Sequence, residues 1–351
     1  MIENKLYLED VLRVTKIKLP WEKLQNSSVL ITGASGLIGS FLVDVIMQLN
    51  YKEKLNCTIY AVGRDEGKAK KKFSHYWETK LFKFVQQDIN TNIQVEGFED
   101  LGYIVHLASN THPIAYSTDP IGTIVTNIIG TKNLLDLAER QKINRFVFAS
   151  SNEIYGENKG DVELFSENYC GYINSNTLRA GYPESKRCGE ALCQAYRKQK
   201  GIDVVIPRLT RSYGPTMLMS DSKAISQFIK KGLENEDIVL KSEGNQFYSY
   251  TYVSDAVAGL LTVMLEGESG EAYNIADIKS DITLRELAET IAEQAHTKVV
   301  FEIPDEIEKV GYSTATKARL DGTKIQQLGW SAQYDIETGI KRTMKILKAI
   351  N

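Results

Sequence analysis

Strand-like and helix-like patterns of apolar residues follow one another along the first two thirds of the chain. Short runs rich in β-branched and aromatic residues, typical of buried strands, occur at Val29 to Thr32 and in the segments TIYAVGR, KFVQQD, YIVHLAS, RFVFASS and DVVIPRL. Apolar residues at helical spacing lie between several of them, notably over 121–141 and 183–200. Because nearly continuous apolar strands alternate with helices, the pattern predicts an α/β fold with a parallel, doubly wound sheet.

The regular alternation ends near residue 210. The later segments YSYTYVSDAVAGLLTVM, EAYNIAD and ITLRELAETIAEQA predict short elements of a smaller lobe, some of which return to the first domain. The segment MIENKLYLEDVLRVTKIKLPWEKL is charged throughout and predicts a helix that packs on the main body. We therefore expect an N-terminal extension over 1–26, a sheet domain over 27–210 and a smaller lobe mainly over 211–351, with a cleft between the lobes.

Composition narrows the class of protein. The formal charge of −3, from 42 basic and 45 acidic residues, gives no electrostatic reason to expect nucleic acid or a membrane surface as partner. There is neither a signal-peptide pattern nor an apolar run long enough to cross a bilayer, so we expect a cytoplasmic protein. Four cysteines without C-x-x-C spacing or a nearby histidine predict reduced thiols and no metal site: Cys57, Cys170, Cys188 and Cys193.

A glycine-rich turn follows the first predicted strand. The segment GASGLIG places Gly33, Gly36 and Gly39 where the backbone must turn sharply, approach a pyrophosphate and let the next helix pack closely. The amide groups at the start of that helix would face the phosphates. Strand, turn and helix together predict a Rossmann-type dinucleotide-binding domain, in which the turn also contributes Ser35, Leu37 and Ile38.

The second strand leaves the choice of dinucleotide open. It is followed by Arg64 and then Asp65, with Lys68 and Lys70 close behind. An acidic residue here accepts the ribose hydroxyl of NAD, whereas an arginine can hold the 2′-phosphate of NADP. We expect NAD, with NADP as the alternative.

Two later strands add further cofactor contacts. Asp88 ends the third strand and is a candidate to hydrogen-bond the adenine, beside Ile89. The segment HLAS is expected to line the cofactor with backbone and small side chains rather than to use His106 as a catalytic imidazole. Its contributing residues are Leu107, Ala108 and Ser109.

The segment YPESK carries the candidate chemistry. Tyr182 and Lys186 are four residues apart, so on a helix they share one face, but this spacing also fits a solvated surface. The motifs GASGLIG, HLAS, FVFASSNEIYG, YPESK, PRLTRSYGP and YTYVSDAV resemble, in order and rough spacing, the extended short-chain dehydrogenases of the NAD-dependent epimerase/dehydratase family. The resemblance covers nearly the whole chain from about residue 27.

The resemblance implies a nucleotide-diphosphate sugar as substrate, a role in polysaccharide biosynthesis, a homodimer, and a catalytic set of Ser151, Tyr182 and Lys186. A phenol with a pKa near 10 is a poor base at neutral pH unless a cation stabilises the phenolate, and Lys186 and an oxidised nicotinamide would both do so. Tyr182 could then take the proton of a sugar hydroxyl while hydride leaves the same carbon, with Ser151 holding the oxygen.

The residues after Ser151 bear on the subtype. The family's dehydratases carry Thr-Asp-Glu or Thr-Ser-Glu where this chain has Ser151, Asn152 and Glu153. Its decarboxylases also keep the glutamate, and many of its simple 4-epimerases have no carboxylate there. Glu153 is therefore a candidate base for the proton beside the new ketone. Asn152, near the substrate, is an amide and cannot be the acid that protonates a leaving hydroxyl.

Two departures from the family pattern concern the substrate phosphates. Arg211 stands where relatives usually have asparagine, and Tyr248 stands where many have an arginine that contacts the diphosphate and, in decarboxylases, the carboxylate. Losing that arginine weakens the decarboxylase hypothesis. Arg211 and Lys223 are candidates to hold the phosphates instead, because a guanidinium can clamp phosphate with two hydrogen bonds.

We therefore expect an enzyme that oxidises the sugar at C4 and then completes a 4-epimerisation or a 4,6-elimination. The alternatives are an NADPH-dependent ketoreductase on a nucleotide-linked sugar and a UDP-glucuronate-type decarboxylase. A dinucleotide sensor without catalysis is a third hypothesis, which the Ser, Tyr and Lys set disfavours because a sensor needs no activated phenol.

Overall fold

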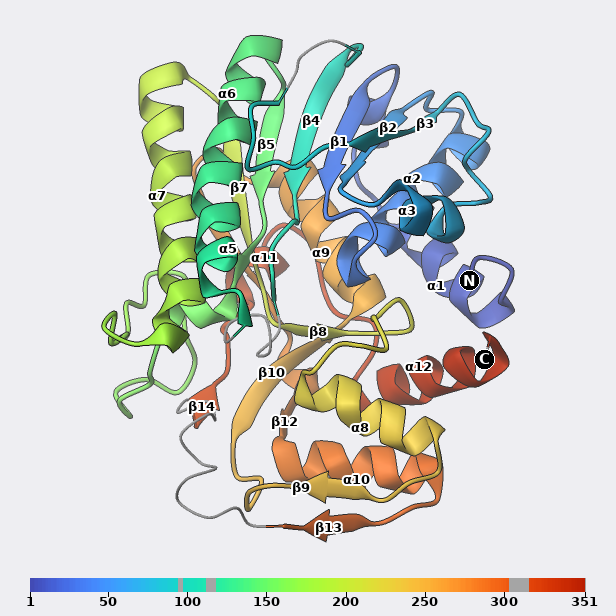
Figure 1. Cartoon of the computed structure of the whole chain (residues 1–351), viewed down its shortest axis with the longest axis vertical. Coiled ribbons are helices and arrows are strands. Elements are labelled where there is room, and N and C mark those ends of the chain that lie inside the picture. The colour runs from blue at the N-terminus through green and yellow to red at the C-terminus, as the bar shows by residue number, and fades with distance from the viewer. Residues whose placement is uncertain (94–96, 112–117, 303–315, 351) are drawn as a thin grey trace.

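The computed structural model describes residues 1–93, 97–111, 118–302 and 316–350. Its centre is an eight-stranded sheet in the upper part of Figure 1, with strands in the order β11-β7-β5-β4-β1-β2-β3 and β6 paired with β7. Every pairing in this sheet is parallel. The strands are β1 (Ser28–Thr32), β2 (Thr58–Gly63), β3 (Phe82–Gln86), β4 (Leu101–His106), β5 (Arg145–Phe148), β6 (Ser150–Ser151), β7 (Val204–Leu209) and β11 (Ala272–Ile275).

The sheet is apolar on both faces, as the continuous apolar runs predict. Along β1, Val29 and Ile31 pack into one layer of core, whereas Leu30 packs into the other. Strands buried on both faces must be covered by helices on both faces, so the predicted parallel, doubly wound sheet is confirmed. The register pairs Thr32 with His106, which brings the loops that follow β1 and β4 side by side at the carboxyl edge.

Helices cover the two faces of the sheet. On one face, α2 (Leu37–Glu53) packs against α1 (Lys5–Val14) and α9 (Val253–Glu266). On the other, α5 (Pro120–Val125), a π-helical turn and α6 (Thr131–Gln141) form one helical run beside α7 (Gly181–Lys200). The π turn at 126–130 interrupts the helix predicted over 121–141. A short helix, α3 (Glu66–Lys72), packs beside β3.

The smaller lobe lies at the bottom of Figure 1. Its helices α8 (Ala224–Leu233) and α10 (Leu284–Ala295) pack together, and Thr283 and Glu286 form a capping box at the start of α10. One small sheet joins β12 (Asp281–Thr283), β10 (Phe247–Tyr252), β14 (Lys317–Ala318) and β8 (Arg211–Tyr213); another pairs β9 (Ile238–Leu240) with β13 (Val299–Phe301).

The chain crosses between the two parts more than once. Helix α9 and strand β11 follow β10 but belong to the layers of the large sheet. The short α11 (Thr323–Gln326) contacts β11, and α12 (Ile336–Ile350) then packs against α8 and also against α1, so that the two chain ends lie near each other in Figure 1. The helix predicted near the N-terminus is thus present as α1, and it packs on the main body.

Candidate active site

A cavity of about 960 Å³ lies between the carboxyl edge of the large sheet and the smaller lobe. The loops after β1, β2, β3 and β4 and the segment from β6 contribute to one side, whereas β8, α8, β9 and β10 contribute to the other. The cavity brings together every site residue that the sequence predicts: Gly33, Ser35, Gly36, Leu37, Ile38, Gly39, Arg64, Asp88, Ile89, Leu107, Ala108, Ser109, Ser151, Asn152, Glu153, Tyr182, Lys186, Arg211, Lys223 and Tyr248.

The glycine turn has the shape that a pyrophosphate requires. Gly33 has φ +67°, and a Cβ there would lie 2.8 Å from the backbone nitrogen of Ala108. A Cβ on Gly39 would lie 2.3 Å from the carbonyl oxygen of Gly33, so only glycine lets the helix start this close to the turn. Helix α2 begins at Leu37, and its N-cap Gly36 offers no side-chain cap, which leaves first-turn amide groups to a bound anion. These residues fit a dinucleotide.

The residues after β2 and β3 lie at one end of the cavity. Arg64 is exposed and lines this end, whereas Asp65 accepts a hydrogen bond from the Lys68 amide at 2.9 Å and so caps α3. Asp88 accepts a hydrogen bond from the Asn90 amide at 2.9 Å. The acidic residue directly after β2 is therefore held by its own helix.

Tyr182 and Lys186 occupy the first turns of α7 and are buried. The Lys186 ammonium donates to the Ala149 carbonyl oxygen at 2.8 Å and lies 4.8 Å from the centre of the Phe148 ring. Burial lowers the pKa of Lys186 to about 8. Burial, followed by the charge of Glu153, raises the pKa of the Tyr182 phenol, which a hydrogen bond with Ser151 lowers only in part. The ammonium is thus bonded to the backbone, and burial favours the protonated phenol.

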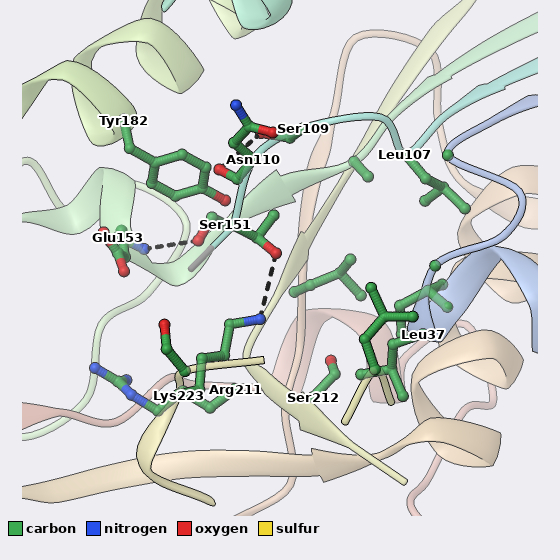
Figure 2. Close-up of a pocket in the computed structure, with 18 of the residues that line it drawn as sticks. Leu37, Leu107, Ser109, Asn110, Ser151, Glu153, Tyr182, Arg211, Ser212 and Lys223 are labelled. Atoms are coloured by element: carbon green, nitrogen blue, oxygen red, sulfur yellow. Dashed lines mark hydrogen bonds between the residues drawn. The ribbon is translucent and has the colours of Figure 1, made fainter. Parts of the chain in front are cut away.

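Ser151 connects β6 to the phenol. Its Oγ accepts a hydrogen bond from the Glu153 amide at 3.2 Å and lies 3.5 Å from Asn152 Oδ1. Figure 2 shows Ser151 below the Tyr182 ring, with Glu153 beside it and Leu37 and Leu107 on the opposite side of the pocket. Ser151 therefore caps the short turn Asn152–Tyr155 and also faces Tyr182.

Arg179 is a site residue that the sequence analysis missed. Its guanidinium contacts both oxygens of the Glu153 carboxylate, at 3.0 Å from Nη2 to Oε1 and 2.9 Å from Nη1 to Oε2. Both side chains line the cavity. The signal in the sequence is weak: Arg179 comes three residues before Tyr182, so that a helical turn places the two close together.

The opposite wall carries the predicted phosphate ligands. The Arg211 guanidinium lies over the Tyr248 ring, with its Cζ 3.6 Å from the ring centre. Among the residues that the structure describes, the buried Arg211 Nη1 has no hydrogen-bond partner. Lys223 Nζ lies 3.3 Å from Thr111 Oγ1 and 3.6 Å from a carboxylate oxygen of Asp221, and Figure 2 shows Lys223 and Arg211 on the same side of the pocket. A cation with an unused buried donor suits an anionic ligand.

Other residues complete this wall. They come from α8, β9 and the segment before β10, where the sequence offers no motif, so only the fold identifies them: Phe228, Val239, Leu240, Lys241 and Gln246.

His106 lies in the core rather than in the cavity. Its ring nitrogens face the hydroxyls of Thr32 at 2.8 Å and Thr131 at 3.1 Å, and burial lowers its pKa well below the usual value. This agrees with the expectation that His106 is not a catalytic imidazole. None of the four cysteines is in a disulfide.

The described part of the chain shows neither a metal-binding cluster nor a membrane-spanning helix. No three His, Cys, Asp or Glu side chains within it are placed to hold a metal ion. The helices within it include none with the length and apolar character needed to cross a bilayer.

The fold and the cavity define a dinucleotide-dependent enzyme of the short-chain dehydrogenase type, with a glycine turn facing a Ser, Tyr and Lys set. Residues 29–276 match the profile of the NAD-dependent epimerase/dehydratase family, and the chain belongs to this family. The predicted family, the class of enzyme and the nicotinamide cofactor are thereby confirmed.

Two proteins with similar sequences are UDP-glucuronic acid decarboxylases. UDP-glucuronic acid decarboxylase 6 of Arabidopsis thaliana is 34% identical over 320 residues, which cover 90% of this chain and 87% of that protein. UDP-glucuronic acid decarboxylase 1 of Danio rerio is 32% identical over 346 residues, covering 97% of this chain and 77% of its own length.

Solved structures share the fold at lower identity. A dTDP-glucose 4,6-dehydratase from Streptomyces venezuelae, solved with NAD and TYD, is 24% identical with a TM-score of 0.79, covering 92% of this chain and 97% of its own. The UDP-glucuronic acid 4-epimerase from Bacillus cereus, solved with UDP-glucuronic acid and NAD, is 21% identical with a TM-score of 0.78, covering 92% and 100%.

Proposed function

We propose that this enzyme oxidises the sugar of a nucleotide-diphosphate sugar at C4 and then completes a redox-neutral 4-epimerisation or 4,6-elimination. The observation that carries the proposal is that Ser151, Tyr182 and Lys186 line the same cavity as the glycine turn. A hydroxyl bound between the phenol and the cofactor can lose its proton and its hydride at one place.

In the proposed mechanism, Tyr182 takes the hydroxyl proton while Ser151 holds the sugar oxygen. Burial keeps the phenol protonated in the protein alone, so it needs added positive charge to become a base. Bound oxidised NAD supplies the hydride acceptor and that positive charge. Lys186, already buried beside Tyr182 on α7, would hold the nicotinamide ribose and favour the phenolate.

For the diphosphate, we propose that Arg211 and Lys223 provide the cations. The stacking on Tyr248 holds the Arg211 guanidinium in one orientation, and its unpaired Nη1 gives a phosphate oxygen a charged donor. Tyr248 then serves as the platform for the cation, which Arg211 supplies from the neighbouring strand.

For the second step, we propose that Glu153 removes the proton at C5 after the ketone at C4 has made it acidic. The change Glu153→Gln keeps the size and the hydrogen-bonding reach but removes the base, so oxidation should proceed and the next step should stall. Reduced nicotinamide and ketosugar should then accumulate, measured by absorbance and mass spectrometry. Glu139→Gln, on α6 outside the cavity, should turn over normally.

The same measurements can also contradict the proposal. Near-normal turnover of Glu153→Gln, together with no solvent deuterium at C5 in the wild type, would remove the elimination branch and leave simple epimerisation. Stoichiometric oxidation of added NADPH by a ketosugar, with no cofactor retained, would contradict the redox-neutral proposal as a whole and favour the ketoreductase.

Decarboxylation is the second candidate function. Two observations favour it: the relatives at 34% and 32% identity are named UDP-glucuronic acid decarboxylases, and Arg179 gives the cavity a cation beside Glu153. Mass spectrometry of the product would identify this reaction by the loss of carbon dioxide from UDP-glucuronic acid.

We also propose a cytoplasmic homodimer. Exposed apolar side chains on α5 and on the turn before α7 support the dimer, since such side chains gain from burial against a second copy: Ile121, Ile124 and Leu178. The unbridged cysteines suit a reducing compartment. Sedimentation of the purified protein at micromolar concentration tests the dimer, and a monomer would contradict it.

A further inference from the structure

The ion pair between Arg179 and Glu153 lies where substrate chemistry is expected. Glu153 follows β6 and Ser151, and Arg179 belongs to the turn Leu178–Ala180 that leads into α7 and Tyr182. The guanidinium engages both carboxylate oxygens, so each partner occupies the other's main hydrogen-bonding edge. A carboxylate held in this way cannot turn freely toward a sugar.

The pair contributes little to folding. The Arg179 side chain is 44% exposed and the Glu153 side chain 25% exposed, and ion pairs in contact with water contribute little to stability. Burial is far greater at the pair of Arg208 and Glu190, whose side chains are 10% and 14% exposed. The first pair can therefore exchange partners at low cost, whereas the second is part of the framework.

The electrostatics of the site explain what such an exchange would do. Burial and then the charge of Glu153 raise the pKa of Tyr182, and Arg179 opposes this rise in part. A second carboxylate entering beside Glu153 and the phenol would meet repulsion unless a cation received it. Arg179 already holds a carboxylate in this cavity, through one hydrogen bond and a second close contact between its guanidinium and the other carboxylate oxygen.

We propose that Arg179 is a specificity-determining residue that receives a carboxylate on the sugar ring, and that Glu153 occupies it before substrate binds. This inference rests on the proposed function, since it assumes that a nucleotide sugar enters this cavity. An acidic sugar replaces Glu153 on the guanidinium and frees the glutamate to face the ring. A neutral sugar has no charge with which to compete for Arg179, so its binding gains nothing from this residue.

The test compares two nucleotide sugars that differ only at C6, UDP-glucuronic acid and UDP-glucose, by calorimetric titration of NAD-loaded protein. Arg179→Gln should weaken binding of the acid about tenfold or more and change binding of UDP-glucose less than about twofold. Arg179→Lys should recover part of the loss. Arg197→Gln, an exposed arginine of α7 outside the cavity, should change neither.

The variant Glu153→Gln distinguishes two roles of Glu153, competition with the substrate for Arg179 and support of the Arg179 side chain. If Glu153 competes with the substrate for Arg179, removing its charge should tighten binding of UDP-glucuronic acid about threefold or more. If Glu153 instead holds Arg179 in place, the change should weaken binding, and that result would overturn the proposal. Thermal melts of both variants should match the wild type, because both side chains of the pair are in contact with water.

The outcomes also distinguish this inference from the proposed function. Equal effects of Arg179→Gln on both sugars, or no effect on either, would overturn the inference while leaving C4 oxidation intact. Arg179-dependent binding of the acid, with no product from the wild type and no reduced nicotinamide in Glu153→Gln, would instead overturn the proposed function and support Arg179 as the group that receives the carboxylate. Binding of neither sugar would overturn both.

Discussion

A carboxylate, a guanidinium and at least one phenol lie together in two regions of this molecule, and the two regions have different roles. In the catalytic cluster, Glu153, Arg179 and Tyr182 lie beside the cavity. In what we call the junction cluster, Asp10, Arg342, Tyr252 and Tyr334 contact one another where α1, α12 and β10 meet. The helices α1 and α12 lie near the two chain ends in Figure 1.

The carboxylate of the junction cluster is buried and fully partnered, although Arg342 Nε has no hydrogen-bond partner among the described residues. Asp10 is 0% exposed and accepts hydrogen bonds from the Tyr252 and Tyr334 hydroxyls, both at 2.7 Å, and from Arg342 at 2.8 Å. Burial, and then Asp10 itself, raise the pKa of both phenols, which therefore remain donors. A buried charge with three donors ties residues 10, 252 and 342 into one unit.

The catalytic cluster has the same groups in an open arrangement. Its ion pair reaches water, and its phenol faces Ser151 and the cavity rather than the carboxylate. The same residue types can therefore form either a structural cluster or a reactive one. Burial and the completeness of the hydrogen bonds decide between the two, because an unfinished set of partners leaves room for a ligand.

The same substitution, Tyr to Phe, should separate the two clusters, and its largest effect is expected at Tyr182. Tyr182→Phe removes the proton acceptor, so turnover should fall about 10³-fold or more. The ring remains buried, so the free energy of unfolding and the affinity for NAD should stay near those of the wild type. Steady-state kinetics and fluorescence titration with NAD provide the measurements.

Turnover within a few-fold of the wild type would show that Tyr182 is not the base. A large loss of stability would also contradict the comparison, since it would place Tyr182 in the framework like the junction phenols.

A smaller effect, in stability rather than turnover, is expected at the junction. Tyr252→Phe removes one of the donors to the buried Asp10 carboxylate, and a hydrogen bond to a charged group contributes about 1.5–3 kcal/mol. The free energy of unfolding should fall by about 2 kcal/mol, measured by urea denaturation, while kcat changes less than about twofold. Loss of turnover without loss of stability would mean that the junction couples to the active site.

The sequence predicts most of the fold because the signals are local. The apolar runs and the GASGLIG turn specify β1, the turn and α2 within a few residues, and the strand following Arg145 is found where RFVFASS predicts it. The strand breaks after Phe148, however, and resumes as β6, so that the loop between them brings the Ala149 carbonyl to Lys186. The residue that uses this break, Lys186, is 37 residues away along the chain. A local sequence pattern therefore cannot predict the break.

The sequence predicts the site unevenly for the same reason. Residues in motifs, such as Tyr182 and Ser151, are found because their spacing carries the chemistry. Arg179 was missed because its partner Glu153 is 26 residues distant, and the stacking of Arg211 on Tyr248 could not be foreseen because β8 and β10 pair across a long insertion. The junction cluster joins positions 10 and 334, which only the complete fold brings together.

The smallest effect in this comparison concerns the buried ammonium of Lys186. Its hydrogen-bond partner is a backbone carbonyl, whereas the junction guanidinium has a carboxylate. Burial lowers the pKa of Lys186 from 10.5 to about 8 in the folded protein. Between these values the unfolded chain binds the proton and the folded one releases it, so the free energy of unfolding should rise with pH, by about 1 kcal/mol from pH 8 to pH 9.

Lys186→Met lacks this dependence. At pH 7 the variant should be more stable than the wild type, because it buries no charge, and its advantage should shrink as the pH rises through 8 toward 10. Urea denaturation of the cofactor-free proteins at pH 7, 8 and 9 measures the difference, with Lys198→Met, an exposed lysine of α7, as the matched control. Parallel pH curves for the wild type and Lys186→Met would show that the ammonium is not destabilised by burial. In that case Lys186 would belong with the satisfied charges of the junction rather than with groups held ready for a ligand.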